Sequence, residues 1–424
     1  METVYVNNYR GFDDSYIWLK KVNFLVGENS TGKTSLIEII NILNDARFWF
    51  NYDINASEIE NFTFDDMKSK VSKEKFFSIG SIEYNDDEKQ NVMNIVKYVE
   101  VEGMPVFEDV WICNKYGIAL FSIDGNKCKY KYKLNDKEEN DLVKTYKETI
   151  ANIAFKSTNY KSIDLPNYNM FFTALYEIEE ADKEIKKIIG GNGLRTLGRN
   201  AGSTIIAPIR AKPKSVYTGG KKINSPEGEH TPFIIRSLLE TKEDQASQKL
   251  VELINIFGKE SGLFDSLSIS TFGKKKTAPF ELDIVKYKHK FKISTVGYGV
   301  SQILPVIVEL IMKRGKGIFT IQQPEVHLHP KAQAAFGEFL YSIAAETDAT
   351  FIVETHSDYL IDRFRYMKYE SAKKVDSQVL YFINENCKNS ATSISIENNG
   401  RYENDQPIEF REFFLNESIK YLEI

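Results

Sequence analysis

The spacing of apolar residues changes along the chain, and the changes predict which kind of element lies where. Residues 22–26 (VNFLV) form a short, mostly apolar run that is typical of a buried strand. The apolar residues that follow recur at the spacing of one helix face: Leu36, Ile37, Ile39, Ile40 and Leu43. Between about residue 45 and residue 200, apolar and polar positions alternate and predict antiparallel strands. The clearest alternating runs are 77–84, 95–101, 106–113 and 118–123, and helical spacing follows at 139–153 and 168–189.

From residue 203 onward, short buried strands alternate with helices. The predicted elements there are 204–207, 250–257, 303–312, 318–321, 332–344, 350–353 and 359–366. This alternation predicts a mostly parallel sheet flanked by helices. We therefore expect an α/β fold in which residues 1–44 and 201–424 form one discontinuous head. Residues 45–200 should form an antiparallel β lobe with a helical insertion.

The glycine-rich segment between the first strand and the first helix carries the clearest chemistry. It reads GENSTGKT from Gly27 to Thr34, the GxxxxGK[ST] pattern in its usual setting. Glycines let backbone N–H groups turn toward phosphate oxygens, the helix start adds a positive dipole, and Lys33 can reach the terminal phosphates. Thr34 is the expected Mg²⁺ ligand. The predicted nucleotide-binding residues are Gly27, Glu28, Asn29, Ser30, Thr31, Gly32, Lys33, Thr34 and Ser35.

Composition and charge limit the classes of protein to consider. The chain has 424 residues, 42% of them hydrophobic and 13% aromatic, which predicts a globular protein of roughly two to three domains. A net charge of −5 gives no general basic field, so a nucleic-acid surface would have to be a local patch. Cys113, Cys128 and Cys387 are odd in number and far apart, which favours a reducing, cytoplasmic compartment. Without a charged and apolar leader or an apolar run of about 18 residues, we expect neither secretion nor a membrane span.

Two series of alternating lysines are candidates for such a patch. The first is Lys127, Lys129, Lys131 and Lys133, and the second is Lys286, Lys288, Lys290 and Lys292, near the basic turn 274–276. On a strand, each series would place its lysines on one face, where they could follow a nucleic-acid backbone. Lysines also protect edge strands and solvate sheet faces, so DNA contact stays one of two interpretations.

A second group of motifs lies in the last third of the chain. Residues 294–302 (STVGYGVSQ) precede an apolar helix expected from Ile303, and glycines with a serine at a helix start suit an anion. The apolar strand 318–321 then runs into Gln322, Gln323, Pro324 and Glu325, followed by HLHP at 327–330. A further strand ends in Glu354-Thr355-His356-Ser357, where the histidine could contact a γ-phosphate or orient water.

The order of these motifs resembles the ABC-type ATPases, and most closely the short ATPases of the OLD and SMC-like group. Residues 8–12 (NYRGF) and 207–211 (APIRA) are also typical of that group. The resemblance covers about residues 1–44 and 204–366, and leaves 45–200 unmatched. Related compact ATPases include PtuA of Septu and AriA of the PARIS system, which serve bacterial defence against phages.

The resemblance implies an ABC-type ATP hydrolase that forms a head-to-tail homodimer or a larger homo-oligomer. ATP and Mg²⁺ would be enclosed between the glycine-rich loop of one chain and the signature residues of the other, which are Gly299, Val300, Ser301 and Gln302. Arg10 and Arg210 could reach the nucleotide or the second chain. The last 50 or so residues show neither a Toprim acid cluster nor an HNH histidine pair, so a nuclease, if one is involved, would be a separate effector subunit.

The resemblance also makes Gln322 unusual, whereas glutamine at the position of Gln323 is common in this subgroup. The position of Gln322 normally carries an acid that serves Mg²⁺, and Gln323 matches the general-base position. An amide carries no charge, so Gln322 cannot act as a carboxylate would toward metal or water. Three explanations compete: a Glu-to-Gln change that traps ATP, which we favour from the sequence; a naturally weak ATPase that works as an ATP-held switch; or transfer of the role to Glu325. Glu325, which follows a proline, is expected to face the dimer interface.

Other classes of function have weaker support in the sequence. An SMC-like DNA-repair or chromosome-maintenance ATPase would bind DNA directly through the lysines. A nuclease within residues 45–200 would need a metal-binding acid cluster, yet the acidic run 85–88 (NDDE) is more simply an exposed turn. Zinc at His327 and His329 lacks a third and a fourth ligand nearby in the sequence.

Overall fold

The computed structural model describes residues 3–57, 62–85, 89–124, 127–164, 171–189, 202–219, 224–241, 244–275, 277–313, 315 and 317–410. The chain divides into two compact units. The first comprises Met1–Leu19, Glu28–Ser203 and Phe382–Ala391, and the second comprises Lys20–Gly27, Thr204–Tyr381 and Thr392–Ile424. The boundaries predicted from the sequence, at residues 44 and 201, stay a prediction.

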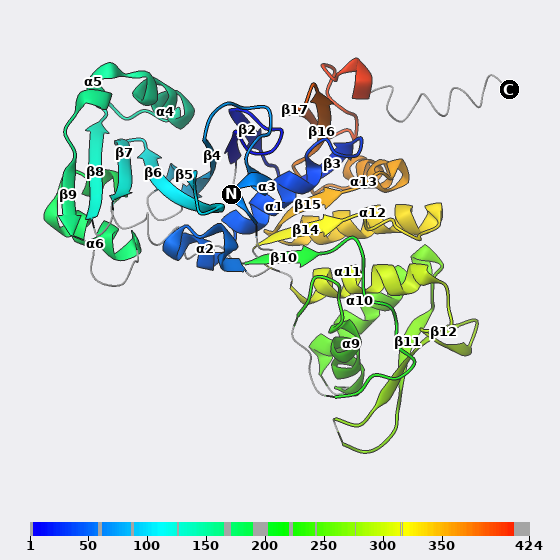
Figure 1. The fold of residues 1–424 in the computed structure, drawn as a ribbon. Coiled ribbons are helices and arrows are strands. Elements are labelled where there is room, and N and C mark those ends of the chain that lie inside the picture. The colour runs from blue at the N-terminus through cyan, green and yellow to red at the C-terminus, as the bar shows by residue number, and fades with distance from the viewer. Residues whose placement is uncertain are drawn as a thin grey trace. The chain divides into compact units, whose positions relative to one another are not determined.

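A six-stranded sheet carries the parallel strands that the sequence predicts. Its order is β10-β14-β15-β3-β16-β17 (Figure 1). The strands are β10 (Ser203–Ile206), β14 (Ile318–Gln322), β15 (Thr350–Glu354), β3 (Val22–Gly27), β16 (Ser377–Glu385) and β17 (Lys388–Ser395). The three strands β14, β15 and β3 run parallel, so their carboxyl ends meet at one edge of the sheet. The chain segments that follow Gln322, Glu354 and Gly27 therefore all start from this edge.

The described part of the second unit also contains helices. They are α9 (Thr231–Glu240), α10 (Gln245–Ser261), α11 (Tyr298–Met312), α12 (Pro330–Glu346) and α13 (Asp358–Glu370). Phe24 of β3 meets Phe364 of α13 with ring centroids 5.0 Å apart. Helices α12 and α13 can approach closely at Gly337 because glycine has no side chain. A Cβ at this position would lie 2.2 Å from the carbonyl oxygen of Leu360. The α/β class expected from the sequence is confirmed.

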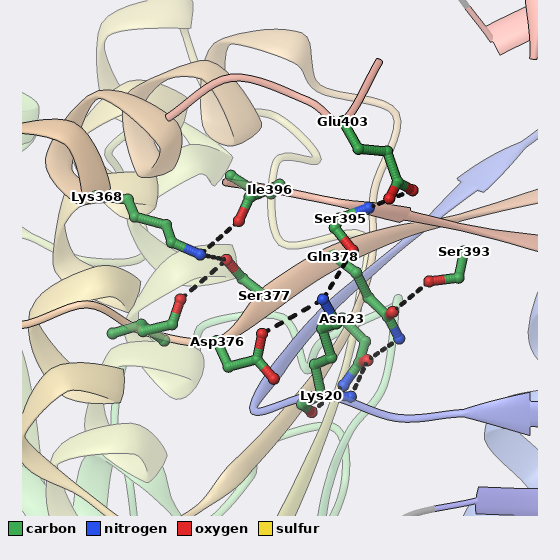
Figure 2. A network of polar contacts seen from close by, with 11 residues as sticks. Lys20, Asn23, Lys368, Asp376, Ser377, Gln378, Ser393, Ser395, Ile396 and Glu403 are labelled. Atoms are coloured by element: carbon green, nitrogen blue, oxygen red, sulfur yellow. Dashed lines mark hydrogen bonds and ion pairs between the residues drawn. The ribbon is translucent and has the colours of Figure 1, made fainter. Parts of the chain in front are cut away.

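Polar contacts join the later strands to β3, as Figure 2 shows. Gln378 Nε2 donates to Asn23 Oδ1 at 2.8 Å, and Ser393 Oγ donates to Gln378 Oε1 at 2.6 Å. The ammonium group of Lys368 is buried and donates to Ser377 Oγ at 3.0 Å and to the carbonyl of Ile396 at 2.6 Å. Burial lowers the pKa of Lys368 to about 8, against the opposing effect of Asp376. The hairpin β16–β17 is thereby fixed to β3 and α13 by buried polar groups.

The first unit is built on an eight-stranded antiparallel sheet of order β2-β1-β4-β5-β6-β7-β8-β9. The strands are β1 (Thr3–Asn7), β2 (Ser15–Trp18), β4 (Phe76–Asn85), β5 (Gln90–Val101), β6 (Met104–Asn114), β7 (Gly117–Asp124), β8 (Lys127–Leu134) and β9 (Lys161–Asp164). The four alternating runs predicted from the sequence are β4 to β7, so that prediction is confirmed. The acidic residues 86–88 lie outside the described residues.

Two of the helices predicted in the first unit are each divided. The helices in the described part of this unit are α1 (Lys33–Leu43), α2 (Ala46–Asn51), η1 (Ile54–Ser57), α3 (Phe64–Met67), α4 (Leu142–Ala151), α5 (Ile153–Ser157), α6 (Phe171–Ala181) and α7 (Lys186–Ile189). The predicted helix 139–153 ends when Asn152 takes an extended conformation and caps α5 through its side chain. The predicted helix 168–189 is two helices, and residues 168–170 lie outside the described residues.

The second unit also contains a three-stranded sheet that the sequence analysis did not predict. It consists of β11 (Ser266–Thr271), β12 (Phe280–Lys286) and β13 (His289–Lys292) in that order. Buried Leu282 and Ile284 alternate with Asp283, which accepts from Ser270 Oγ at 3.0 Å. None of the helices in the described part of the chain has both the length and the apolar character that crossing a membrane requires.

Candidate nucleotide and metal site

The glycine-rich loop begins where β3 ends and closes on the start of α1. Gly32 is the N-cap of α1 with φ +101°, a conformation that favours glycine, and the amide of Leu36 already donates to its carbonyl at 3.0 Å. The Thr31 hydroxyl and the Lys33 ammonium both donate to the carbonyl of Glu28, at 2.8 and 2.6 Å. Lys33 is therefore held within the loop.

The exposed residues of this loop are the ones that a ligand can reach. Glu28, Asn29, Ser30 and Thr34 are exposed, whereas Thr31, Lys33 and Ser35 are buried. The Thr34 hydroxyl lies in the first turn of α1, where a helix offers N–H groups and a positive dipole. Loop, lysine and helix start together form the arrangement that GxxxxGK[ST] predicts for a phosphate site.

Arg10 is bound to the first unit's own residues. Its Nη1 donates to Ser35 Oγ at 2.9 Å and lies 2.7 Å from Glu38 Oε2, and its Nε donates to the carbonyl of Asp66 at 3.2 Å. Arg10 thus fixes the first turns of α1, next to the residues expected to bind phosphate. Its direct contact with nucleotide stays a prediction.

Gln322 and Gln323 end β14 beside an acid that the sequence analysis had not selected. In the strand register Gln322 pairs with Glu354 of β15, and Gln322 Nε2 donates to Glu354 Oε2 at 3.3 Å. The backbone turns sharply at Gln323, whose φ is +44°, and its amide donates to the carbonyl of Glu354 at 2.8 Å. An acid at the end of the neighbouring parallel strand was the signal that could have revealed Glu354.

Arg210 also holds this turn. Its guanidinium donates to the carbonyls of Gln322 at 2.6 Å and of Gln323 at 3.1 Å, and its backbone amide donates to Gln302 Oε1 at 3.4 Å. Arg210 is 2% exposed, and burial lowers its pKa to about 10 while the charge of Glu325 acts in the opposite direction. A charged arginine at neutral pH therefore fixes the strand end through backbone carbonyls.

Glu325 lies against the segment that follows β15. Its Oε1 accepts from the backbone amide of His356 at 2.7 Å. Its Oε2 is buried and has no hydrogen-bond partner among the residues that the structure describes. An unpaired buried carboxylate oxygen is costly, so this atom is suited to accept a proton donor or a cation. This contact places Glu325 within its own unit; the prediction that it faces a dimer interface remains untested.

The residues around His356 and the HLHP segment mainly start helices. Ser357 caps α13 by accepting from the amide of Leu360, and it donates to Gln333 Oε1 at 2.6 Å. His329 caps α12 through its side chain, whereas the rings of His327 and His356 are exposed. The described residues contain no cluster of three or more acids, histidines or cysteines that could hold a metal.

The signature segment belongs to the first turns of α11. The helix begins at Tyr298, five residues before the predicted start at Ile303, with Gly297 as its N-cap. Ser301 and Gln302 are each 6% exposed, and the Ser301 hydroxyl donates to the carbonyl of Tyr298 at 2.8 Å. Gly299 and Val300 lie between these residues and Tyr298, whose side chain is exposed. Contact of these residues with a second chain stays a prediction.

The first lysine series does lie on one strand, but one of its members is covered. In β8, Cys128 and Tyr130 are buried as the alternation predicts. Lys131 is only 5% exposed, and its ammonium donates to the carbonyl of Phe155 at 3.0 Å. Lys127 lies 3.9 Å from Asp164 of β9. The predicted strand is therefore confirmed, although Lys131 is buried, and contact of its lysines with a nucleic acid stays a prediction.

The second lysine series is interrupted by a hairpin. Tyr287 and Lys288 have φ of +52° and +68° and form the two-residue turn between β12 and β13. Lys292 pairs with Glu281 at 2.8 Å. The prediction of one continuous ladder is wrong, because alternation continues through a turn that sequence periodicity does not show. Lys288 and Lys290 remain exposed beside Tyr287 and Phe291, which are 78% and 45% exposed.

Comparisons with solved structures return SMC head domains, at low identity. A structure of the SMC head bound to the C-winged helix domain of ScpA is 12% identical, with a TM-score of 0.47, over 93% of this chain and 98% of that chain. The SMC head domain from Thermotoga maritima is 11% identical, with a TM-score of 0.42, over 92% and 98%. The Pyrococcus furiosus head with an extended coiled coil, bound to the C-terminal domain of ScpA, is 12% identical, with a TM-score of 0.40, over 100% and 98%.

The family comparison covers most of the chain. No match was found among the curated proteins. A family model described as AAA ATPase domain matches residues 1–361, which include the glycine-rich loop, the strand ending in Gln322 and the segment through His356. The chain therefore belongs to the AAA ATPase domain family.

Proposed function

We propose that this chain binds ATP with Mg²⁺ and uses the bound state to control a partner effector. The observation that carries the proposal is the loop from Gly27 to Thr34, with Lys33 held by the carbonyl of Glu28 and with α1 starting at its end. Backbone amides, a lysine and a helix start are what a triphosphate requires. The family match supports the same ligand.

The predicted site residues offer mainly oxygen atoms as metal ligands, and these suit Mg²⁺. Thr34 and Gln322 stay the metal ligands predicted from the sequence; Thr34 offers a hydroxyl and Gln322 an amide oxygen. When bound, Mg²⁺ would neutralise phosphate charge. The orphaned Oε2 of Glu325 supports this fit, because a buried carboxylate oxygen needs a partner.

Glu325 is the proposed general base. Gln322 and Gln323 cannot take a proton from water at neutral pH, whereas a carboxylate can. One oxygen of Glu325 is fixed by the amide of His356, and the other is unpaired. This arrangement supports transfer of the catalytic role to Glu325, one of the three explanations for the glutamines.

The contact between Gln322 and Glu354 argues against a simple trapping substitution. A glutamate at position 322 would place two carboxylates where an N–H···O bond of 3.3 Å now lies. Two adjacent carboxylates cannot both be charged unless a cation lies between them. Without Mg²⁺, glutamine is therefore the residue that matches Glu354, and the lack of a carboxylate at position 322 supports a slow ATPase that works as an ATP-held switch.

The test is ATP binding and turnover by the whole chain, compared with Lys33→Ala and Gln322→Glu. We expect the parent to bind ATP with Mg²⁺ and to turn over slowly, and Lys33→Ala to lose binding. A trapped enzyme would instead gain turnover many-fold in Gln322→Glu without a change in ATP affinity. Parent protein that fails to bind ATP with Mg²⁺ would refute the proposed function itself.

A head-to-tail dimer around ATP and a role in antiphage defence belong to the same proposal. Their support is the resemblance of the motifs to the OLD and SMC-like ATPases. Sedimentation with and without ATP tests the dimer: we expect self-association only with nucleotide, and its loss in Lys33→Ala. Co-purification of a separate nuclease subunit from the native host would support the effector role.

The alternative function is direct DNA binding by an SMC-like ATPase. It is favoured by the exposed hairpin turn, where Lys288 and Lys290 lie beside Tyr287 and Phe291. Lysines supply salt-dependent contacts with phosphates, and aromatic rings can stack on unpaired bases. Duplex binding that weakens with salt and is lost in the double variant Lys288→Ala/Lys290→Ala would favour this function. The double variant Lys127→Ala/Lys133→Ala is the matched control.

A further inference from the structure

We propose that Glu354 supplies the negative charge that the Mg²⁺ site lacks at Gln322. The inference rests on the proposed ATP-binding function and assigns a metal-site role to an acid on the neighbouring strand. It also explains how a site that ends β14 in two amides can retain a divalent cation.

The strand register brings Glu354 to the required place. Paired residues of parallel neighbours project from the same face of a sheet, so Gln322 and Glu354 lie side by side. Glu354 pairs in turn with Leu25 of β3. Gly27, the first residue of the phosphate-binding motif, comes two positions later on the same face, roughly 7 Å further along the strand. Within the second unit, Glu354 therefore lies between the strand that ends in the glutamines and the strand that leads to the loop.

In the part of the chain that the structure describes, no cationic side chain balances the charge of Glu354. The residue is 6% exposed, and its side chain accepts from the neutral amide of Gln322. Among the described residues, no lysine, arginine or histidine forms an ion pair with it. The nearby guanidinium of Arg210 is engaged by the carbonyls of Gln322 and Gln323. A buried carboxylate without a counter-charge is costly, and a divalent cation removes that cost.

The hydrogen bond from Gln322 to Glu354 determines which atom of the Gln322 amide is available to a cation. Because Nε2 of Gln322 donates to Glu354, the amide oxygen of Gln322 is left for another donor or for a cation. Position 322 then contributes a neutral oxygen and position 354 the charge. Hard cations such as Mg²⁺ are bound by one or two carboxylates together with neutral oxygens and phosphates, so this set suits the ion.

The experiment measures how binding of a fluorescent ATP analogue to the full chain depends on Mg²⁺. Affinity is determined in EDTA and across a series of Mg²⁺ concentrations for the parent, Glu354→Gln and the exchange variant Gln322→Glu/Glu354→Gln. We expect Glu354→Gln to raise the Mg²⁺ concentration for half-maximal enhancement roughly 10- to 100-fold, while affinity in EDTA is unchanged. The exchange variant returns the charge to the site and should restore the parent's midpoint.

The controls separate this inference from the proposed function. Glu370→Gln removes an equal charge from the exposed end of α13 and should leave the midpoint unchanged. If the parent binds no analogue, the proposed function fails. If the parent shows Mg²⁺-enhanced binding and Glu354→Gln retains its midpoint, the inference is overturned while the function stands. If Glu354→Gln loses binding even in EDTA, the exchange variant decides: restored Mg²⁺ dependence supports the inference, and no restoration overturns it.

Discussion

Replacing Arg210 with methionine should loosen the strand end that carries Gln322 and Gln323. Methionine fills much of the same buried volume but donates no hydrogen bond. The substitution removes charged hydrogen bonds of 2.6 and 3.1 Å to two carbonyls, each contributing about 1.5–3 kcal/mol. Relief of the buried charge offsets part of this loss, so we expect a net destabilisation of about 2–4 kcal/mol. Because Gln323 has φ of +44°, the turn should also relax toward a less strained backbone and displace Glu325.

The assay is urea unfolding combined with steady-state ATP turnover. We expect a lower unfolding midpoint and a reduced kcat, with KM changed little, because the glycine-rich loop is untouched. Arg210→Lys keeps the charge, but lysine lacks the planar guanidinium that donates to two carbonyls at once. It should therefore lower the unfolding midpoint and kcat less than Arg210→Met does. Arg363→Met is the control: its exposed ion pair with Glu338 contributes about 0–1 kcal/mol. An Arg210→Met protein with the parent's midpoint and kcat would refute the reasoning.

Three further predictions concern the loop, the proposed base and a buried lysine. Gly32→Ala should abolish ATP binding, because its Cβ would lie 2.7 Å from Cζ of the buried Phe12 ring. Gly103→Ala, also at positive φ but with nothing within 4 Å of its Cβ, should keep binding in the same titration. Glu325→Gln should lower kcat by at least about 100-fold while ATP affinity stays within the parent's range, and equal turnover would exclude Glu325 as the base. Lys368 has a pKa of about 8 in the folded chain and about 10.4 when unfolded, so the unfolded chain binds more protons between these values and stability rises with pH there. Between these pH values, urea unfolding should show that the free energy of unfolding rises more in the parent than in Lys368→Met, by on the order of 3 kcal/mol. Identical pH dependence in the two proteins would contradict this prediction.

Sequence patterns predicted the parts of the molecule that depend on local order. The GENSTGKT segment has its strand before it and its helix after it, so its residues are neighbours in sequence and in space. The alternating runs that became β4 to β7 also pair with sequential neighbours. Local periodicity is sufficient where an element and its partner follow each other along the chain.

The contacts around Gln322 are long-range, and no local pattern contains them. Arg210 meets Gln322 across 112 residues, and Gln322 meets Glu354 across 32. Identifying these contacts requires the sheet order, which the spacing of apolar residues does not give. Periodicity also missed the turn at Tyr287 and Lys288, because two residues in the left-handed conformation preserve the alternation of lysines.

The polar link between Asn23 and Gln378 has a consequence for how the chain is synthesised. The two residues are 355 positions apart, yet they lie on neighbouring strands. During translation, β3 and the loop that follows it leave the ribosome long before β15 and β16, between which β3 is inserted in the finished sheet. The phosphate loop therefore lacks its rigid support until most of the polypeptide has been made, and nascent chains should not capture nucleotide early. Assembly of this sheet is expected to be a slow, late event, because closing so long a loop carries a large entropic cost.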